Sequence, residues 1–96
     1  MISWERSINI KSPSEIEIMR EAGRINAEAL SAAVALIEPG VTTQSLNDEF
    51  EAVHKKYAVY SPFKNYPGPY PYPASICTSI NEELVHGIPS NRKLQE

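Results

Sequence analysis

The 96-residue sequence is poor in cysteine, in aspartate and in basic charge. Its single cysteine, Cys77, excludes an intrachain disulfide framework and favours a reducing, intracellular compartment. The balance of 9 basic against 12 acidic residues gives a net charge of -3. A nucleic-acid partner is therefore not expected, because such a surface needs Lys and Arg clustered on one face.

Long apolar runs are also absent. No run approaches the ~20 residues of a membrane-spanning helix, and residues 1–6 lack the basic start and apolar stretch of a signal peptide. We therefore expect a cytoplasmic protein with no membrane partner. The length predicts a single domain over residues 1–96. Within it, residues 1–11 are expected to be an N-terminal extension and residues 61–73 a loop rich in proline and tyrosine.

Metal ligands are scarce as well. The chain has two histidines, His54 and His86, and one aspartate, Asp48. A catalytic metal site needs three or more protein ligands that converge on one point. His54 and Asp48 are spaced so that they lie on different faces of a predicted helix, and both are expected to be ordinary surface residues. We predict no complete metal site within this sequence.

A long amphipathic helix is the first feature that is present. The run Ser12-Pro13-Ser14-Glu15 combines an N-cap, a proline suited to the first helical position and the glutamate of a capping box. Apolar residues recur at helical spacing until Pro39-Gly40, where the helix is expected to end. The apolar stripe is wide, which predicts that other elements cover most of the helix. Gly23 within it suggests close packing against a sheet.

A second helix is expected to begin with Thr42 or Thr43 as its N-cap. Apolar residues follow at steps of three and four and so share one face. These are Leu46, Phe50, Val53 and Tyr57. Glu51 and Lys55 lie one helical turn apart, which predicts an ion pair between them.

The composition changes after Tyr60, because residues 61–73 hold five of the 8 prolines and three of the 5 tyrosines. Such a segment cannot form a regular helix or a central strand. Ser75 to Ile80 is then predicted to be a strand, with small residues on one face that leave room for another group. The predicted fold class is α/β (α+β), with two helices packed on an incomplete antiparallel sheet.

The segment from Pro73 to Pro89, PASICTSINEELVHGIP, resembles the part of type I methionine aminopeptidases that carries the first active-site histidine. Three further motifs agree with this family in the same order: Ser12 to Ile16, Glu21-Ala22-Gly23-Arg24, and Pro39 to Thr43. An ordered series of four motifs rarely arises by chance. The resemblance implies the N-terminal half of a pita-bread fold, in which two αβ repeats enclose a two-metal centre.

The resemblance also implies roles for individual residues. His86 would be a catalytic residue near the scissile amide, where an imidazole can hydrogen-bond the reacting group and stabilise its developing charge. The sulfur of Cys77 suits the thioether of a methionine side chain. The residues expected to bind the substrate are His86, Cys77, Tyr72, Tyr66 and Phe63.

The chain departs from the commoner family spacing between Tyr66 and Tyr72, where it is longer. This difference leaves the placement of Tyr66, Tyr70 and Phe63 open. Tyr72 is placed better, because it adjoins Pro73 and the predicted strand.

The cofactor implied by the resemblance is a pair of divalent metal ions (Co, Mn, Fe or Zn) in the complete enzyme. The family's ligands are two aspartates, a histidine and two glutamates, and they would fall beyond Glu96. No position here matches them, Glu82 and Glu83 included. We therefore expect this segment to be inactive alone. Its implied partners are nascent chains with an N-terminal methionine, together with either the missing C-terminal half or a second copy of itself.

Two other interpretations stay open. The first is a non-catalytic interaction module that presents residues 61–73 to an SH3 or WW domain. Against it, the prolines from Pro67 to Pro73 lie two apart, so that neither Pro-x-x-Pro nor Pro-Pro-x-Tyr occurs. The second is a non-catalytic or Xaa-Pro-specific member of the same fold. Such members usually carry a large domain before the first helix, which here is expected to begin near Ser12.

Overall fold

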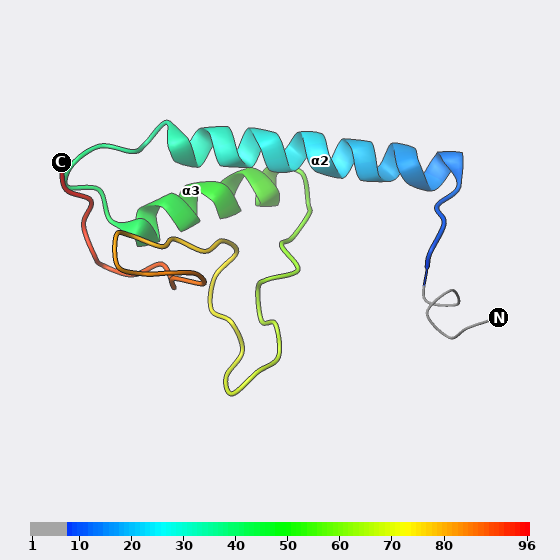
Figure 1. Cartoon of the computed structure of the whole chain (residues 1–96). Coiled ribbons are helices and arrows are strands. Elements are labelled where there is room, and N and C mark those ends of the chain that lie inside the picture. Colours follow the sequence, from blue (N-terminus) through cyan, green and yellow to red (C-terminus); the bar gives the residue numbers. More distant parts are fainter. Residues whose placement is uncertain (1–7) are drawn as a thin grey trace.

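The structure, a computed structural model, describes residues 8–96. Two helices dominate it, α2 over Pro13–Val34 and α3 over Thr43–Lys56. They run side by side in opposite directions, and the chain after α3 folds back along that helix (Figure 1). Most of the expected extension over residues 1–11 lies outside the described residues. In the part that is described, neither helix is long and apolar enough to cross a bilayer.

The start of α2 is the predicted capping box. The Ser12 hydroxyl accepts a hydrogen bond from the Glu15 amide at 3.2 Å, and the Glu15 carboxylate accepts one from the Ser12 amide at 2.8 Å. The helix ends at Val34, earlier than the Pro39-Gly40 boundary that we predicted. Beyond it the amides of Leu36 and Ile37 donate to carbonyls only three residues back, so the last turn tightens and the helix stops.

The start of α3 also agrees with the sequence, because Thr42 is its N-cap and accepts a hydrogen bond from the Ser45 amide at 3.1 Å. The first amides of a helix have no partner within the helix. Here the Thr43 amide donates to the Arg92 carbonyl at 3.1 Å, and the Gln44 amide donates to Ser90 at 2.8 Å. A segment from the far end of the chain thus completes the N-terminus of α3.

The core lies between the two helices. Ala29 and Ala33 of α2 pack against Leu46 and Phe50 of α3. The small alanine side chains let α3 approach α2 closely. Half-buried residues from four places in the chain cover this cluster: Val41, Val53, Ile76 and Leu94. The predicted apolar face of α3 is therefore the face that is buried.

The first half of α2 is exposed, contrary to the prediction that other elements cover most of this helix. Ile16 is 44% exposed and Met19 is 57% exposed. A β carbon added at Gly23 would meet nothing within 4 Å, so the expected packing of Gly23 against a sheet is also not found. The reason is length, because α2 has 22 residues and α3 has 14. In Figure 1 the beginning of α2 extends beyond α3.

The predicted strand over Ser75 to Ile80 is wrong, because these residues have no regular structure. Within residues 8–96 the β contact is an isolated antiparallel bridge between Thr42 and Lys93. A strand needs a neighbour that pairs its backbone along its length. Ser75 instead donates its amide to the side chain of Asn47 at 2.9 Å.

His54 is buried, although we predicted a surface residue. Only 8% of it is exposed, and its ring centroid lies 4.4 Å from that of Phe50. The two residues are one helical turn apart, so His54 shares the face that Phe50 buries. Burial lowers the pKa of His54 and so favours a neutral imidazole, while the charge of Glu51 opposes this effect.

Candidate functional site

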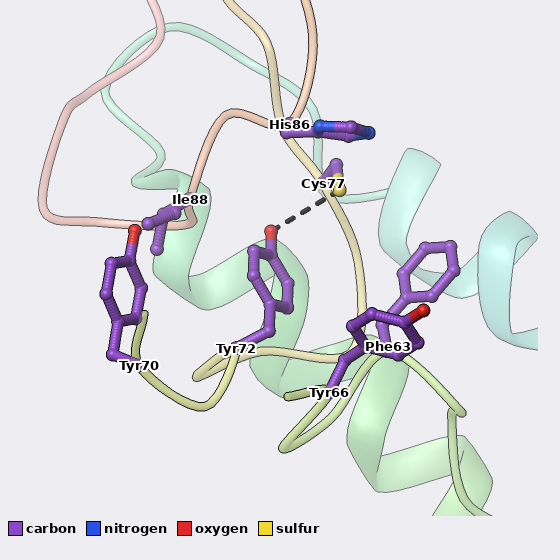
Figure 2. Close-up of a pocket in the computed structure, with 7 residues that line it drawn as sticks. All are labelled: Phe63, Tyr66, Tyr70, Tyr72, Cys77, His86 and Ile88. Carbon is purple, nitrogen blue, oxygen red and sulfur yellow. Dashed lines mark hydrogen bonds between the residues drawn. The ribbon is translucent and has the colours of Figure 1, made fainter. Parts of the chain in front are cut away.

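A cavity of about 360 Å³ lies between the loop of residues 61–73 and the chain that follows it. It brings together all five residues predicted to bind the substrate, which are Phe63, Tyr66, Tyr72, Cys77 and His86 (Figure 2). Tyr70 and Ile88 complete the wall. Apart from His86, the lining is aromatic, aliphatic or sulfur-containing, and it therefore suits an apolar side chain.

The loop of residues 61–73 is closed by its own backbone. The Asn65 amide donates to the Tyr72 carbonyl at 2.7 Å, and the Tyr72 amide donates to the Tyr66 carbonyl at 3.0 Å. Asn65 adopts a φ of 64°, which asparagine tolerates better than most residues. Pro67, Pro69 and Pro71 have no N–H to satisfy, so they suit the exposed tip. The closure places the rings of Tyr66 and Tyr72 at the same cavity.

Helix α3 anchors the segment that leads to Cys77. Asn47 is 1% exposed, and its side-chain oxygen accepts the hydrogen bond from the Ser75 amide. The Glu51 carboxylate accepts hydrogen bonds from the Ser75 hydroxyl at 2.9 Å and from the Lys64 ammonium at 2.8 Å. Lys64, rather than the predicted Lys55, is thus the ionic partner of Glu51 in the structure.

The environment of Glu51 acts on its charge in two directions. Burial raises the pKa of the carboxyl, and the hydrogen bonds from Lys64 and Ser75 lower it. The hydrogen bonds prevail, so the pKa of Glu51 lies below its ordinary value. Glu51 is therefore charged at neutral pH and holds the base of the loop to α3.

His86 lies on a turn that Gly87 makes possible. A β carbon at Gly87 would overlap the carbonyl oxygen of Thr78, so this position has no room for a side chain. The Thr78 amide donates to the Gly87 carbonyl at 2.7 Å, and the Gly87 amide donates to the Ser79 hydroxyl at 3.1 Å. His86 has a φ of 56° and is exposed. Figure 2 shows its imidazole close to Cys77 at the edge of the cavity.

The hydroxyl of Tyr72 lies between two segments of the site. It is 2.9 Å from the Ile76 carbonyl, 3.4 Å from the Cys77 sulfur and 3.4 Å from the Gly87 carbonyl, all of which can accept its proton. Burial raises the pKa of Tyr72, and the hydrogen bond to Cys77 raises it further. The phenol is therefore protonated, and available as a donor, throughout the physiological range.

The residues present do not fit the metal ions that the resemblance implies. Among residues 8–96 no three His, Cys, Asp or Glu side chains come together as a metal-binding group. Glu82 and Glu83, which the sequence also failed to match to ligands, bind Arg92 instead. Their carboxylate oxygens lie 3.0 and 3.3 Å from its guanidinium.

Comparison with known proteins places this chain in a family. Residues 17–96 match the model of metallopeptidase family M24, and this range is most of the chain. The chain belongs to metallopeptidase family M24. This assignment and the relatives described next confirm the resemblance that the four ordered motifs indicated.

Curated relatives of this M24 chain include the methionine aminopeptidase of Clostridium acetobutylicum. It is 49% identical over 87 residues, which are 91% of this chain and 34% of the relative. An uncharacterized protein of Micrococcus luteus is 45% identical over 84 residues, which are 88% of this chain and 95% of that protein. The chain thus spans about a third of the methionine aminopeptidase and nearly all of the shorter protein.

The crystal structure of the methionine aminopeptidase from Thermotoga maritima has a TM-score of 0.83 to this M24 chain at 40% identity. The match covers 93% of this chain and 34% of that one. The expected pita-bread fold, of which this chain forms a part, is therefore confirmed.

The sequence left two residues of the cavity unassigned, Tyr70 and Ile88. Tyr70 lies in the stretch that is longer than the commoner family spacing, so alignment to the family could not place it. Ile88 follows His86 by two residues, and this position in the sequence was the available signal. In Figure 2 Tyr70 and Ile88 lie close together at one end of the cavity, and Phe63 and Tyr66 at the other.

Proposed function

We propose that this chain forms the substrate-binding side of a methionine aminopeptidase, a metal-dependent exopeptidase that removes the initiator methionine from nascent proteins in the cytoplasm. One observation carries the proposal. The residues Phe63, Tyr66, Tyr72, Cys77 and His86 line a single cavity, although they are spread over two segments of the chain.

The cavity suits an unbranched thioether. Its volume of about 360 Å³ lies at the lower end of the range of small-molecule pockets. The rings of Phe63 and Tyr66 offer apolar surface at one end, and methionine sulfur packs favourably against aromatic rings. The Cys77 sulfur adds a soft, polarisable contact. A charged or branched side chain would find fewer complementary groups here.

His86 is the group that acts on the peptide in this proposal. Its imidazole lies at the edge of the cavity, where the bond that follows a bound methionine would pass. From there it can hydrogen-bond the scissile amide and stabilise the charge that develops on it. The turn at Gly87 holds the imidazole in this place.

The divalent ions of the family supply the activation of water and carbonyl in such enzymes. Since residues 8–96 hold no group that fits them, we propose that their ligands lie in a C-terminal segment that associates with this chain. In the proposal the chain alone hydrolyses nothing. Its exposed apolar residues on α2, such as Ile16 and Met19, favour association with that segment or self-association.

A chimera tests the function. This chain would be joined to the part of the Thermotoga maritima methionine aminopeptidase that its match does not cover. Methionine release from a methionyl tripeptide would be measured with Co²⁺ or Mn²⁺. We expect release by the chimera and a loss of about a hundredfold or more in the His86→Ala chimera, because a group that stabilises developing charge contributes on that scale. A folded, metal-binding chimera that releases no methionine would overturn the proposal.

Two controls accompany this assay. The Lys55→Ala chimera changes an exposed residue of α3 outside the cavity and should release methionine at the parent rate. The isolated chain should neither bind the ions saturably nor release methionine. Turnover by the isolated chain would show that the proposed division between the two segments is wrong.

A further inference from the structure

The ring of Tyr72 lines the cavity, and its hydroxyl contacts backbone and side-chain groups of two segments. We propose that it is a positioning group, which contacts the carbonyl of Gly87, fixes the turn that carries the His86 imidazole and connects this turn to the segment of Cys77. The effect of this positioning on catalysis rests on the proposed function. The positioning itself does not, and its main test needs no substrate.

The first argument is the place of the hydroxyl. It lies within hydrogen-bonding distance of the Ile76 carbonyl at 2.9 Å, the Cys77 sulfur at 3.4 Å and the Gly87 carbonyl at 3.4 Å. Ile76 and Cys77 belong to one segment, and Gly87 belongs to the turn that carries His86. The phenol has one proton, which these acceptors share, with the Ile76 carbonyl the nearest, so a single hydroxyl contacts both segments that meet at the cavity.

The second argument is the conformation of His86. Its φ of 56° is uncommon for a residue with a side chain and persists only where the surroundings hold it. The groups that hold the turn are the Thr78 amide, the Ser79 hydroxyl and the Tyr72 hydroxyl. All three contact the backbone of Gly87. Of the three, the Tyr72 hydroxyl belongs to the loop of residues 61–73.

The third argument is the contrast with the other tyrosines of the cavity. In Figure 2 the Tyr72 hydroxyl points toward Cys77 and His86, whereas those of Tyr66 and Tyr70 lie away from this pair. Among residues 8–96, a side-chain hydrogen bond to the His86 turn is made by Tyr72 and by neither of these two rings. Burial also raises the pKa of Tyr72, so the hydroxyl keeps the proton that it donates.

The test is the Tyr72→Phe variant of the full chain, which keeps the ring and removes the hydroxyl. Hydrogen exchange of the Thr78 amide, which is bonded to the same Gly87 carbonyl, should become about tenfold faster, in line with the loss of one supporting hydrogen bond. The NMR signals of the His86 ring should move, and those of His54 should not. Unchanged Thr78 exchange together with unchanged His86 signals would overturn the proposal.

The matched control is Tyr57→Phe. It removes a hydroxyl that donates to Glu28 at 2.9 Å, between the end of α3 and α2, far from the turn in sequence. It should leave the Thr78 exchange rate and the His86 signals as they are in the parent chain. Equal changes in both variants would mean that general loosening, rather than the Tyr72 hydroxyl, controls the turn.

Two further measurements separate positioning from packing. Cys77→Ala removes the sulfur acceptor and should lower the pKa of the Tyr72 phenol, which NMR of ring-labelled tyrosine can follow. An unchanged titration would overturn the link to Cys77.

In the active chimera, Tyr72→Phe should lower kcat severalfold with little change in KM. A rise in KM with no change in kcat would contradict a positioning role and would mean that Tyr72 only lines the cavity. An inactive chimera would remove the proposed function, while the exchange experiment still decides the geometry.

Discussion

The backbone of Gly87 lies so close to the carbonyl of Thr78 that no side chain fits between them. The same two residues share a hydrogen bond of 2.7 Å from the Thr78 amide to the Gly87 carbonyl. This contact brings the turn of His86 against the segment of Cys77, and so it forms one side of the cavity.

Gly87→Ala should therefore disrupt the turn. The added β carbon meets the Thr78 backbone, which cannot rotate aside as a flexible side chain would. We expect a loss of about 1–3 kcal/mol in the free energy of unfolding, as for other overpacked positions. Urea unfolding followed by circular dichroism measures it. An unfolding midpoint equal to that of the parent would contradict the contact.

Gly23→Ala should have the opposite effect. A β carbon at Gly23 meets nothing within 4 Å, and α2 gains helix propensity from the change. The expected gain in the free energy of unfolding is about 0.5–1 kcal/mol in the same urea experiment. A loss instead of a gain would mean that another surface packs on this face of α2, as the sheet expected from the sequence would.

Asn47→Ala should loosen the segment before Cys77. The change leaves the buried Ser75 amide without its acceptor, and such a loss costs about 1–3 kcal/mol. Hydrogen exchange of the Ser75 amide should become faster, because this amide loses its acceptor. Gln44→Ala, an exposed position on the same helix, should change stability by less than about 0.5 kcal/mol. Equal effects of the two variants would argue against the anchor.

Acidification should weaken the fold through His54. Its pKa in the folded chain lies below the ordinary value of 6.5, because burial disfavours the charged ring. The unfolded chain therefore binds the proton more readily, so stability is full above pH 6.5 and falls as the pH drops toward the folded pKa. The charged groups near His54 are Glu51, Lys55 and Lys64. The pKa of Glu51 is lowered, so its protonation affects stability only at a lower pH, below its ordinary 4.5.

Urea unfolding at several pH values between 7.5 and 5 checks this dependence. His54→Phe keeps an aromatic ring beside Phe50 and removes the titrating group, so the loss of stability over this range should become smaller. An identical pH dependence in the parent chain and in His54→Phe would exclude His54 as its source.

The starts of the helices could be predicted because capping acts over three residues. Ser12 and Glu15 satisfy each other, and Thr42 satisfies Ser45, within a single turn of chain. The ordered motifs of the family could likewise be recognised without coordinates. The co-location of Cys77 and His86 followed from that resemblance, and the structure brings them to one cavity.

The partners of Glu51 could not be predicted from spacing. Lys55, one turn away, was the expected ion-pair partner, but Lys64 and Ser75, 13 and 24 residues later, hold the carboxylate instead. The strand expected from Ser75 failed for a related reason, because Asn47 takes the amide that a neighbouring strand would have paired. His54 is a different case, because its place one turn after Phe50 puts it on the buried face, and the prediction of a surface residue did not use that spacing.

Local order in this protein was thus encoded residue by residue: two capped helices, a proline-rich loop between α3 and Cys77, and the motif that carries His86. Folding in three dimensions then settled which faces are buried and how Tyr72, Cys77 and Gly87 come into contact. Hydrogen bonds within one turn depend only on adjacent residues. Burial and long-range pairing depend on segments that are distant in the chain, and those meet only when the whole chain has folded.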